Sequence, residues 1–481
     1  MVRRKIVGTL VCAVLVGGCT LAPAYTRPEA PVSQAYPVET KEEGDAHAAD
    51  LGWRDVFGDE RLQSLVSLAL ENNRDLRVAA LNVERVQAQY RIQRAPLFPN
   101  VGLGANATFQ ELPSAIPSSA FIPKSQYSLN LGVTSWELDF FGRTRSLSDA
   151  ALEQYFATDE ARRSAHLALV GQVATAHFNE RATSDQLELA RKTLQLVEES
   201  FRLTQRSFEL GTSSELDLKT GESQVETARA TLAFYEQQHA QAVNALVFLI
   251  GRPLPDDLPA SKPLGEATVM ADLPAGLPSD LLARRPDILA AEHQLLAANA
   301  NIGAARAAFF PSISLTGAGG LSSPDLGSLF AGSAFTWNFI PRLNLPIFQG
   351  GALKANLDVA EISKRIEIAE YERAIQAAFR DVADALVTRE TIGKQLEAQK
   401  ARVAAEERRY QLAEMRYRAG IERYVTLLTA QRDLYSAQQQ LIDVQFARLA
   451  NVANLYRALG GGWNENTATA EAAPAQPGQQ G

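Results

Sequence analysis

Histidines and carboxylates, the side chains that most often catalyse reactions or bind metals, form no recognisable site in this sequence. The histidines are His47, His166, His177, His239 and His293. None of them is accompanied by a cysteine or a carboxylate at the spacing of a metal site. The sequence also has no phosphate-binding loop after a strand, no nucleophile elbow and no HExxH motif. We therefore predict a protein that is not an enzyme and needs neither a metal nor another cofactor.

The cysteines suggest one chemical modification, which is the attachment of a lipid. A basic cluster at Arg3–Lys5 precedes an apolar run at Ile6–Val16. That run is shorter than the about 20 residues of a membrane-spanning helix and is typical of a signal peptide. It leads into Gly17-Gly18-Cys19, which resembles the lipobox of bacterial lipoproteins, where the cysteine is acylated and becomes the first residue. We predict a signal peptide over residues 1–18 and a lipid on Cys19; an ordinary signal with an incidental cysteine is the alternative.

The predicted lipid would attach the protein to a membrane. The residue after Cys19 is Thr20. An aspartate at that place would resemble a signal for retention in the inner membrane. A single lipid chain binds a membrane only marginally unless a second signal reinforces it. No apolar run of 18 or more residues follows the signal peptide, so we expect no transmembrane helix. A part of this chain that spans a membrane would have to be a closed β-barrel.

The remaining chain is an internal duplication. The run APLFPNVGL at residues 95–103 returns as AAFFPSISL at residues 307–315. A period of about 210 residues is far longer than the about 20 to 50 residues of a solenoid repeat, and it indicates two fused copies of one unit. The boundaries that we expect are an N-terminal tether over 19–57, a first repeat over 58–252, a Pro-rich linker over 253–278, a second repeat over 279–463 and a disordered tail over 464–481.

Each half contains two segments in which apolar residues alternate with small or polar ones. We predict strands near 101–109, 127–140, 313–321 and 335–347. The alternation changes phase near Ser135, which indicates a β-bulge. Strands of about ten residues with one apolar face are the weak signature of an outer-membrane barrel, although a soluble sandwich shows the same pattern. Because the smallest such barrels have about eight strands, a barrel here would have to be shared between several chains.

Long heptad patterns follow both strand pairs. Apolar residues recur at a spacing of seven over 144–210 and again after Gly211, and the second half repeats this on both sides of Gly420. Heptads of this length predict paired, supercoiled helices, and the helix over 144–210 would be about 100 Å long. A fibrous coiled-coil scaffold would show the same heptads, but it would not need the strand pairs.

These features together resemble one family. The lipobox, the duplicated strand-strand-helix-helix unit, the FFP-S strand start, Gly142 and Gly350 before the long helices, and the ending ANLYRALGGGW at Ala453–Trp463 resemble the outer-membrane factor family. That family includes TolC and OprM, and the lipoprotein signal points to its OprM/NodT-like branch. The resemblance implies a mixed α/β membrane protein. Its four β-strands per chain would form one twelve-stranded outer-membrane β-barrel in a homotrimer, and its long coiled-coil helices would form a periplasmic α-barrel.

The resemblance also implies a function and partners. The trimer would be the passive exit channel of a tripartite efflux system for drugs or other small molecules. Its partners would be a periplasmic adaptor protein, an RND-type pump of the inner membrane and outer-membrane lipid. With a net charge of −8, we expect no nucleic acid among the partners. The alternatives are a TolC-like conduit for an ABC-type protein secretion system and a periplasmic scaffold that is not a channel.

Two groups of site residues follow from the resemblance. The adaptor-docking tips are the turns between the paired helices, Gly211, Thr212, Ser213, Gly420 and Ile421. Glycine permits a tight reversal of the chain, so plain turns explain these residues equally well.

The other group is a periplasmic gate of Asp217, Arg416, Tyr417 and Arg432. Tyr417 is the family's aromatic residue, and Asp217 is the expected acidic partner. TolC-like chains carry aspartates where this sequence has Thr426 and Thr429. The alternative for Asp217 is a solvent-facing position at a helix N-terminus, where the helix dipole favours an acidic residue.

Overall fold

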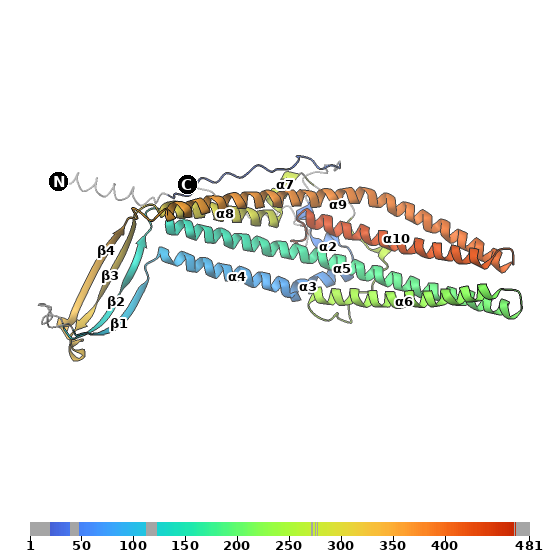
Figure 1. Cartoon of the computed structure of the whole chain (residues 1–481), viewed down its shortest axis with the longest axis horizontal. Helices are drawn as coiled ribbons and strands as arrows, with labels where there is room; N and C mark the ends of the chain where they lie inside the picture. The colour runs from blue at the N-terminus through green and yellow to red at the C-terminus, as the bar shows by residue number, and fades with distance from the viewer. Residues whose placement is uncertain are drawn as a thin grey trace. The chain divides into compact units, whose positions relative to one another are not determined.

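The computed structural model describes residues 20–38, 48–111, 123–270, 273, 274, 276, 278–465 and 467 (Figure 1). The predicted signal peptide and Cys19 therefore lie outside the described residues. The chain divides into two compact units. The first, called the strand unit here, contains Met1–Glu29, Asn82–Asp159 and Ala290–Glu372, and the second, called the hairpin unit, contains Ala30–Leu81, Glu160–Leu289 and Arg373–Gly481.

The strand unit contains one antiparallel sheet. Its strands are β1 (Val101–Phe109), β2 (Ser125–Leu138), β3 (Ser312–Ser323) and β4 (Phe335–Asn344), in the order β1-β2-β3-β4. Figure 1 shows them side by side. The four strands predicted from the alternation are present, two from each half of the duplication. The central pair β2 and β3 joins the two halves of the sequence in one sheet.

The bulge predicted near Ser135 is confirmed. The register between β2 and β3 shifts between Val133 and Trp136, and Ser135 has φ = 52°. Its backbone N–H donates to the Thr316 hydroxyl, 3.1 Å away. One extra residue at this point moves the following side chains of β2 to the other face of the sheet, which explains the change of phase in the sequence.

The two edge strands of this sheet are exposed along their whole length in the single chain. Strand β4 carries Phe335, Trp337 and Phe339, each at least 60% exposed, and β1 carries Leu103, which is 71% exposed. Unpaired edges with large apolar side chains require covering in a stable protein. The sheet is thus built to be completed by other molecules.

Helices make up most of the remaining chain. The first half contains α2 (Trp53–Val56), α3 (Glu60–Asn72), α4 (Arg74–Arg94), α5 (Arg143–Glu209) and α6 (Glu215–Ile250), and the second half contains α7 (Pro278–Arg284), α8 (Pro286–Ala307), α9 (Ala352–Arg418) and α10 (Tyr424–Ala458). Helices α5, α6, α9 and α10 match the predicted helices. Helices α7 and α8 are the second half's counterparts of α3 and α4, and the sequence patterns do not predict them. Among the described residues, no helix combines the length and the apolar character needed to cross a membrane.

The heptad seams predicted from the sequence form packed contacts. Val197 of α5 packs with Val225 and Ala228 of α6. Near the end of the other hairpin, Ala413 of α9 packs with Leu427 of α10. Each pair of helices is therefore an antiparallel coiled-coil hairpin held by small and branched apolar side chains.

The main core of the hairpin unit lies where α2, α3, α5, α6 and α10 meet the linker between the repeats. Its largest fully buried side chains include Trp53, Phe57, Leu62, Leu65, Phe178, Leu246, Ile250 and Tyr456. Phe57 also forms an antiparallel bridge with Val269 of the linker. The linker is thus part of the fold rather than a free connection.

The predicted disordered tail does not begin at Asn464. The Asn464 and Glu465 carbonyls accept hydrogen bonds from the backbone N–H groups of Trp53 and Arg54. The Glu465 carboxylate also pairs with the Arg54 guanidinium at 2.7 Å, and the Thr467 N–H donates to Asp55. These residues continue the ordered chain past Trp463 because the start of α2 offers them partners.

Candidate functional site

The two hairpin tips have the same backbone geometry. Gly211 and Gly420 have φ values of +78° and +69°, a left-handed conformation that other residues adopt only with strain. The N–H groups of both glycines bond to the carbonyl three residues earlier. The N–H groups of Thr212 and Ile421 bond to the carbonyl five residues earlier, and the Thr212 hydroxyl shares that acceptor. Each tip is a Schellman-type helix end.

The tips also expose apolar side chains, most of which were not predicted from the sequence. Leu210 and Leu216 flank the first tip and are 73% and 76% exposed. At the second tip, Val425 takes the place of Leu216, and Ile421, which was predicted, directly follows Gly420; both are also exposed. Such side chains around a tight turn form a small surface suited to a protein partner. The sequence does contain a signal for these apolar residues, because each lies within a few positions of Gly211 or Gly420.

The predicted gate residue Tyr417 connects the two hairpins. Its hydroxyl lies 3.3 Å from the Thr204 hydroxyl of α5. Its ring packs on Tyr424 at the start of α10, with centroids 5.5 Å apart. Burial raises the pKa of Tyr424, so this phenol stays neutral. Thr204, which is fully buried, is a residue of this cluster that was not predicted from the sequence.

The predicted gate arginines bind acidic residues other than Asp217. The Arg416 Nε lies 3.4 Å from Glu422, and Arg432 Nη2 lies 3.6 Å from Asp433. The Thr426 hydroxyl donates to Glu422 and lowers its pKa, which keeps the carboxylate charged opposite Arg416. Thr426 thus supports an acidic side chain four residues earlier on the chain.

Asp217 lies at the N-terminus of α6, as the alternative prediction proposed. Its N–H donates to the Ser214 hydroxyl at 3.1 Å, while its carboxylate accepts from that hydroxyl at 2.7 Å and from the Ser214 N–H at 3.4 Å. This arrangement is a capping box. Asp217 is half-buried, so part of its carboxylate stays accessible at the tip.

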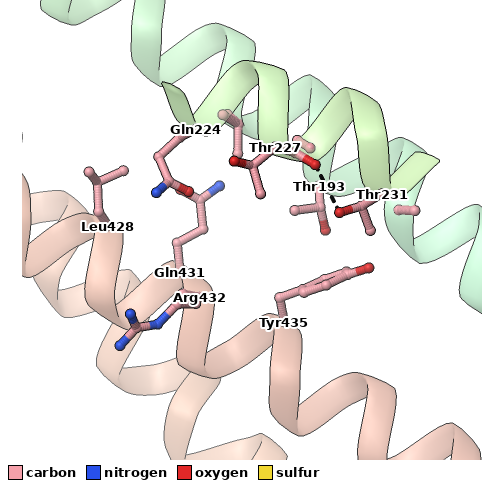
Figure 2. Close-up of a pocket in the computed structure, with 11 residues that line it drawn as sticks. Thr193, Gln224, Thr227, Thr231, Leu428, Gln431, Arg432 and Tyr435 are labelled. Atoms are coloured by element: carbon pink, nitrogen blue, oxygen red, sulfur yellow. Dashed lines mark hydrogen bonds between the residues drawn. The ribbon is translucent and has the colours of Figure 1, made fainter. Parts of the chain in front are cut away.

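A pocket of about 200 Å³ lies between the first hairpin and α10 (Figure 2). Its walls include Thr193, Gln224, Thr231, Leu428, Gln431, Arg432 and Tyr435. Gln431 is only 8% exposed, and its amide nitrogen has no hydrogen-bond partner among the described residues. The predicted gate residue Arg432 therefore borders a space between the hairpins, two turns along α10 from Tyr424, on which Tyr417 packs.

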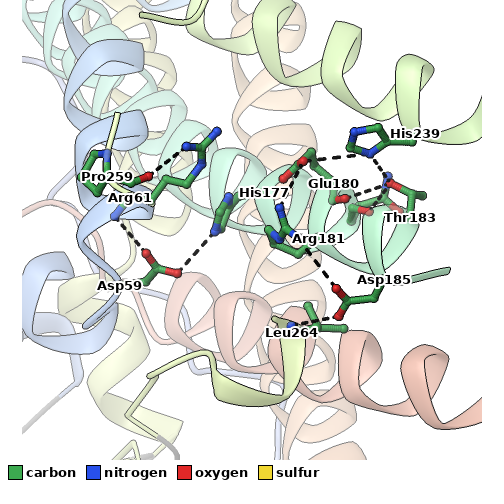
Figure 3. Close-up of polar contacts among 11 residues, drawn as sticks. Asp59, Arg61, His177, Glu180, Arg181, Thr183, Asp185, His239, Pro259 and Leu264 are labelled. Carbon is green, nitrogen blue, oxygen red and sulfur yellow. Dashed lines mark hydrogen bonds and ion pairs between the residues drawn. The ribbon is translucent and has the colours of Figure 1, made fainter. Parts of the chain in front are cut away.

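A polar belt around the middle of α5 holds the linker between the repeats (Figure 3). We define this belt as Asp59, Arg61, His177, Glu180, Arg181, Asp185 and His239. Arg61 donates to the Pro259 carbonyl at 2.9 Å, and Asp185 accepts from the Leu264 N–H at 3.0 Å. Both contacts attach the linker to helices of the first repeat.

The belt brings histidines and carboxylates together that are far apart in the sequence. His177 Nε2 lies 3.5 Å from Asp59, and both side chains are buried. Burial alone would raise the pKa of Asp59, but His177 and the N–H groups of Leu62 and Arg61 outweigh it and lower that pKa. In the strand unit, His293 pairs with Glu153 at 2.6 Å. No cluster of metal-binding side chains occurs among the residues that the structure describes.

Comparison with known proteins agrees with this architecture. The family model for outer membrane efflux proteins matches residues 65–252 and 277–461. The toluene efflux pump outer membrane protein TtgC of Pseudomonas putida is 49% identical over 97% of this chain and 97% of its own. The cation efflux system protein CusC of Escherichia coli is 42% identical over 94% of this chain and 98% of its own.

Solved structures show the same fold. The open state of the MtrE outer membrane channel of Neisseria gonorrhoeae superposes with a TM-score of 0.86 at 43% identity, and the match covers 94% of this chain and all of that one. The outer-membrane channel OprN has a TM-score of 0.84 at 27% identity, with 93% and 100% of the two chains covered. The family predicted from the lipobox, the duplication and the heptads is thereby confirmed. The chain belongs to the outer membrane efflux protein family.

Proposed function

We propose that this protein is the outer-membrane channel subunit of a tripartite efflux system, which passively conducts small molecules from an inner-membrane pump to the exterior. The observation that carries the proposal is the sheet of the strand unit, because both of its edges and many of its apolar side chains are exposed in the single chain. Three copies, placed edge to edge, would pair β4 of one chain with β1 of the next. They would close a barrel of twelve strands, which removes all exposed edges.

The relatives support the class of cargo. TtgC carries a name that refers to a toluene efflux pump, and CusC a name that refers to cation efflux. Cargo as different as a hydrocarbon and a cation argues for a conduit that does not select by a binding pocket. We therefore assign the choice of cargo to the pump and its periplasmic adaptor, and the exit path to this chain.

The docking tips are the proposed contact with the adaptor. Leu210, Leu216, Ile421 and Val425 would be buried in that contact, while Gly211 and Gly420 shape the turns beneath them. Apolar side chains at the centre of a small interface contribute most of its binding energy.

The gate is proposed to close by joining the hairpins. The Tyr417–Thr204 contact holds the second hairpin against the first, and the packing of Tyr417 on Tyr424 fixes the Tyr417 ring within the second hairpin. Arg416, paired with Glu422, and Arg432 supply positive charge, and the half-buried Asp217 supplies negative charge at the other tip. In a trimer, Asp217 of one chain would face the arginines of a neighbouring chain.

Export by living cells tests the function. Deletion of the gene should raise the intracellular level of an apolar dye or antibiotic, and the wild-type gene should restore export. A secretion conduit would instead leave small-molecule accumulation unchanged and abolish the release of a protein. A periplasmic scaffold would change neither of these transport rates.

A further inference from the structure

The N-terminal segment that follows the predicted lipid site lies along α8 in a fixed register. The Leu21 carbonyl accepts from Arg306, the Pro23 carbonyl accepts from Asn299 at 2.8 Å, and Arg27 pairs with Glu292. The segment therefore runs antiparallel to the helix. All of these residues belong to the strand unit.

The length of the segment matches the stretch of helix that it follows. From Glu292 to Arg306 the helix rises about 21 Å, at about 1.5 Å per residue. From Leu21 to Arg27 a nearly extended chain covers about 21 Å, at about 3.5 Å per residue. Because the two lengths agree, the nearly extended segment can follow α8 from Arg306 to Glu292, and contacts hold it at both of its ends.

Glu292 is the strongest of the contacts. Arg27 approaches its carboxylate with two nitrogens, at 2.7 and 2.5 Å, and the Tyr25 hydroxyl donates to it at 3.0 Å. The Glu292 side chain is only 9% exposed. Loss of the Arg27 side chain alone would leave this largely buried carboxylate without its ion-pair partner, which is costly in a folded protein. The contact between Arg27 and Glu292 therefore holds the segment on α8 in the folded protein.

The surface of α8 is shaped for the segment at two further positions. Lys364 of α9 binds the Asn299 side-chain oxygen at 2.8 Å and so turns the amide nitrogen toward Pro23. Gly303 has no side chain, and a Cβ there would lie 2.8 Å from the Ala22 backbone nitrogen. A larger residue at Gly303 would push the segment away.

The free end of the segment lies at the end of α8 that leads into the sheet. Every connection between a helix and a strand at this end carries exposed apolar side chains. They are Phe98 before β1, Phe140 after β2, Phe309 and Phe310 before β3, and Ile347 and Phe348 after β4. Aromatic residues gathered at one level of a membrane protein mark the boundary between lipid and water.

We propose that residues 20–27 are a strap of fixed length that holds the lipid-bearing residue 19 at the level of these connections. The strap makes the lipid and the strands enter the membrane at one level, as two parts of a single anchor. A lipid held beside the strands acts at a higher effective concentration than one on a flexible tether. This inference rests on the proposed lipidation of Cys19 and on the proposed outer-membrane function.

The test separates the strap from the remaining N-terminal segment. Gly-Ser-Gly is inserted between Leu21 and Ala22, which loosens the lipid but leaves the contacts of Pro23, Tyr25 and Arg27 in place. The matched control carries the same insertion between Ala30 and Pro31, beyond the Glu292 contact. The readout is the rate at which newly made protein becomes resistant to urea extraction from outer membranes, with the lipid on Cys19 measured by mass spectrometry.

We expect the first insertion to slow this rate about threefold or more and the control to leave it unchanged. In a Cys19→Ala background with an ordinary signal peptide, the two insertions should behave alike, because there is no lipid to position. Arg27→Glu should slow the rate like the first insertion, and Arg27→Glu with Glu292→Arg should restore it.

Equal rates for both insertions in lipid-bearing protein would overturn the strap. An unmodified Cys19 would overturn it as well. Either result would leave the proposed channel function intact, because conductance of the purified protein measures that function separately.

Discussion

The hydroxyl of Tyr417 in α9 lies 3.3 Å from the hydroxyl of Thr204 in α5, and this contact joins the two coiled-coil hairpins near their tips. Thr204 also donates to the Ser200 carbonyl within its own helix. Tyr417 is therefore the natural donor to Thr204, and the loss of its hydroxyl removes one bond between the hairpins without leaving a cavity.

Tyr417→Phe should favour the open channel. A neutral hydrogen bond contributes about 1 kcal/mol, so the ratio of closed to open states should fall about fivefold for each chain that loses this bond. Single-channel recordings of the purified protein measure this ratio. Thr204→Val should have the same effect, and the double variant should add little to either change, since both remove one bond. Additive effects of the two substitutions would show that the pair does not act as one latch.

Asp217 has two candidate roles that two substitutions separate. Asp217→Asn keeps an oxygen that can accept from the Ser214 hydroxyl and N–H but removes the charge, and we expect it to weaken the preference of the channel for cations. Ser214→Ala removes the partner of Asp217 in the capping box but keeps the charge, so it should lower thermal stability by about 1 kcal/mol and leave ion preference unchanged. Reversal potentials in a salt gradient measure the preference. If Asp217→Asn leaves them unchanged, Asp217 is only a helix cap.

The glycines at the tips should be needed for export and not for folding. Gly211→Val and Gly420→Val place a branched side chain at a positive φ, which costs about 1–2 kcal/mol and distorts the turn. A Cβ at either position would have no neighbouring atom within 4 Å, so crowding adds nothing. We expect higher drug susceptibility with normal amounts of assembled protein in the membrane.

Gly393→Val is the matched control for the tips, because Gly393 lies within α9 with equally open surroundings and a helical backbone. It should leave drug susceptibility unchanged. Wild-type susceptibility in the two tip variants would mean that the adaptor binds elsewhere.

The stability of the hairpin unit should depend on pH through Asp59. The pKa of this carboxyl is lower in the folded protein than in the unfolded chain, where it is about 3.9. Its contribution is therefore present above about pH 4 and is lost as the pH falls toward the folded pKa. Asp59→Asn should lower the Tm in detergent at pH 7, and the difference from wild type should shrink as the pH falls below 4. A constant difference over this range would exclude the Asp59 carboxylate as its cause.

Local periodicity explains which elements of the fold could be predicted from the sequence. The strands, the bulge at Ser135 and the coiled-coil hairpins each leave a repeating pattern within one segment, and the family follows from their duplication. Helices α7 and α8 were missed because α8 is rich in alanine and apolar on more than one face, which gives no clear stripe.

The side-chain contacts within the sites could not be predicted from the sequence, for a different reason. Thr204 and Tyr417, Asp59 and His177, and Glu292 and Arg27 come from segments far apart in the sequence. No spacing rule relates such residues before the fold is known. Asp217 shows the opposite case, since Ser214 three residues earlier is a visible sign of a capping box, and the structure contains that cap.

The central claim is that this chain forms a channel, and its most direct test is the current carried by purified protein in a planar lipid bilayer. The account predicts stepwise increases of ionic current, each from one inserted assembly, with a larger current for Tyr417→Phe. Correctly folded protein that inserts into the bilayer and carries no current, both as wild type and as Tyr417→Phe, would contradict it.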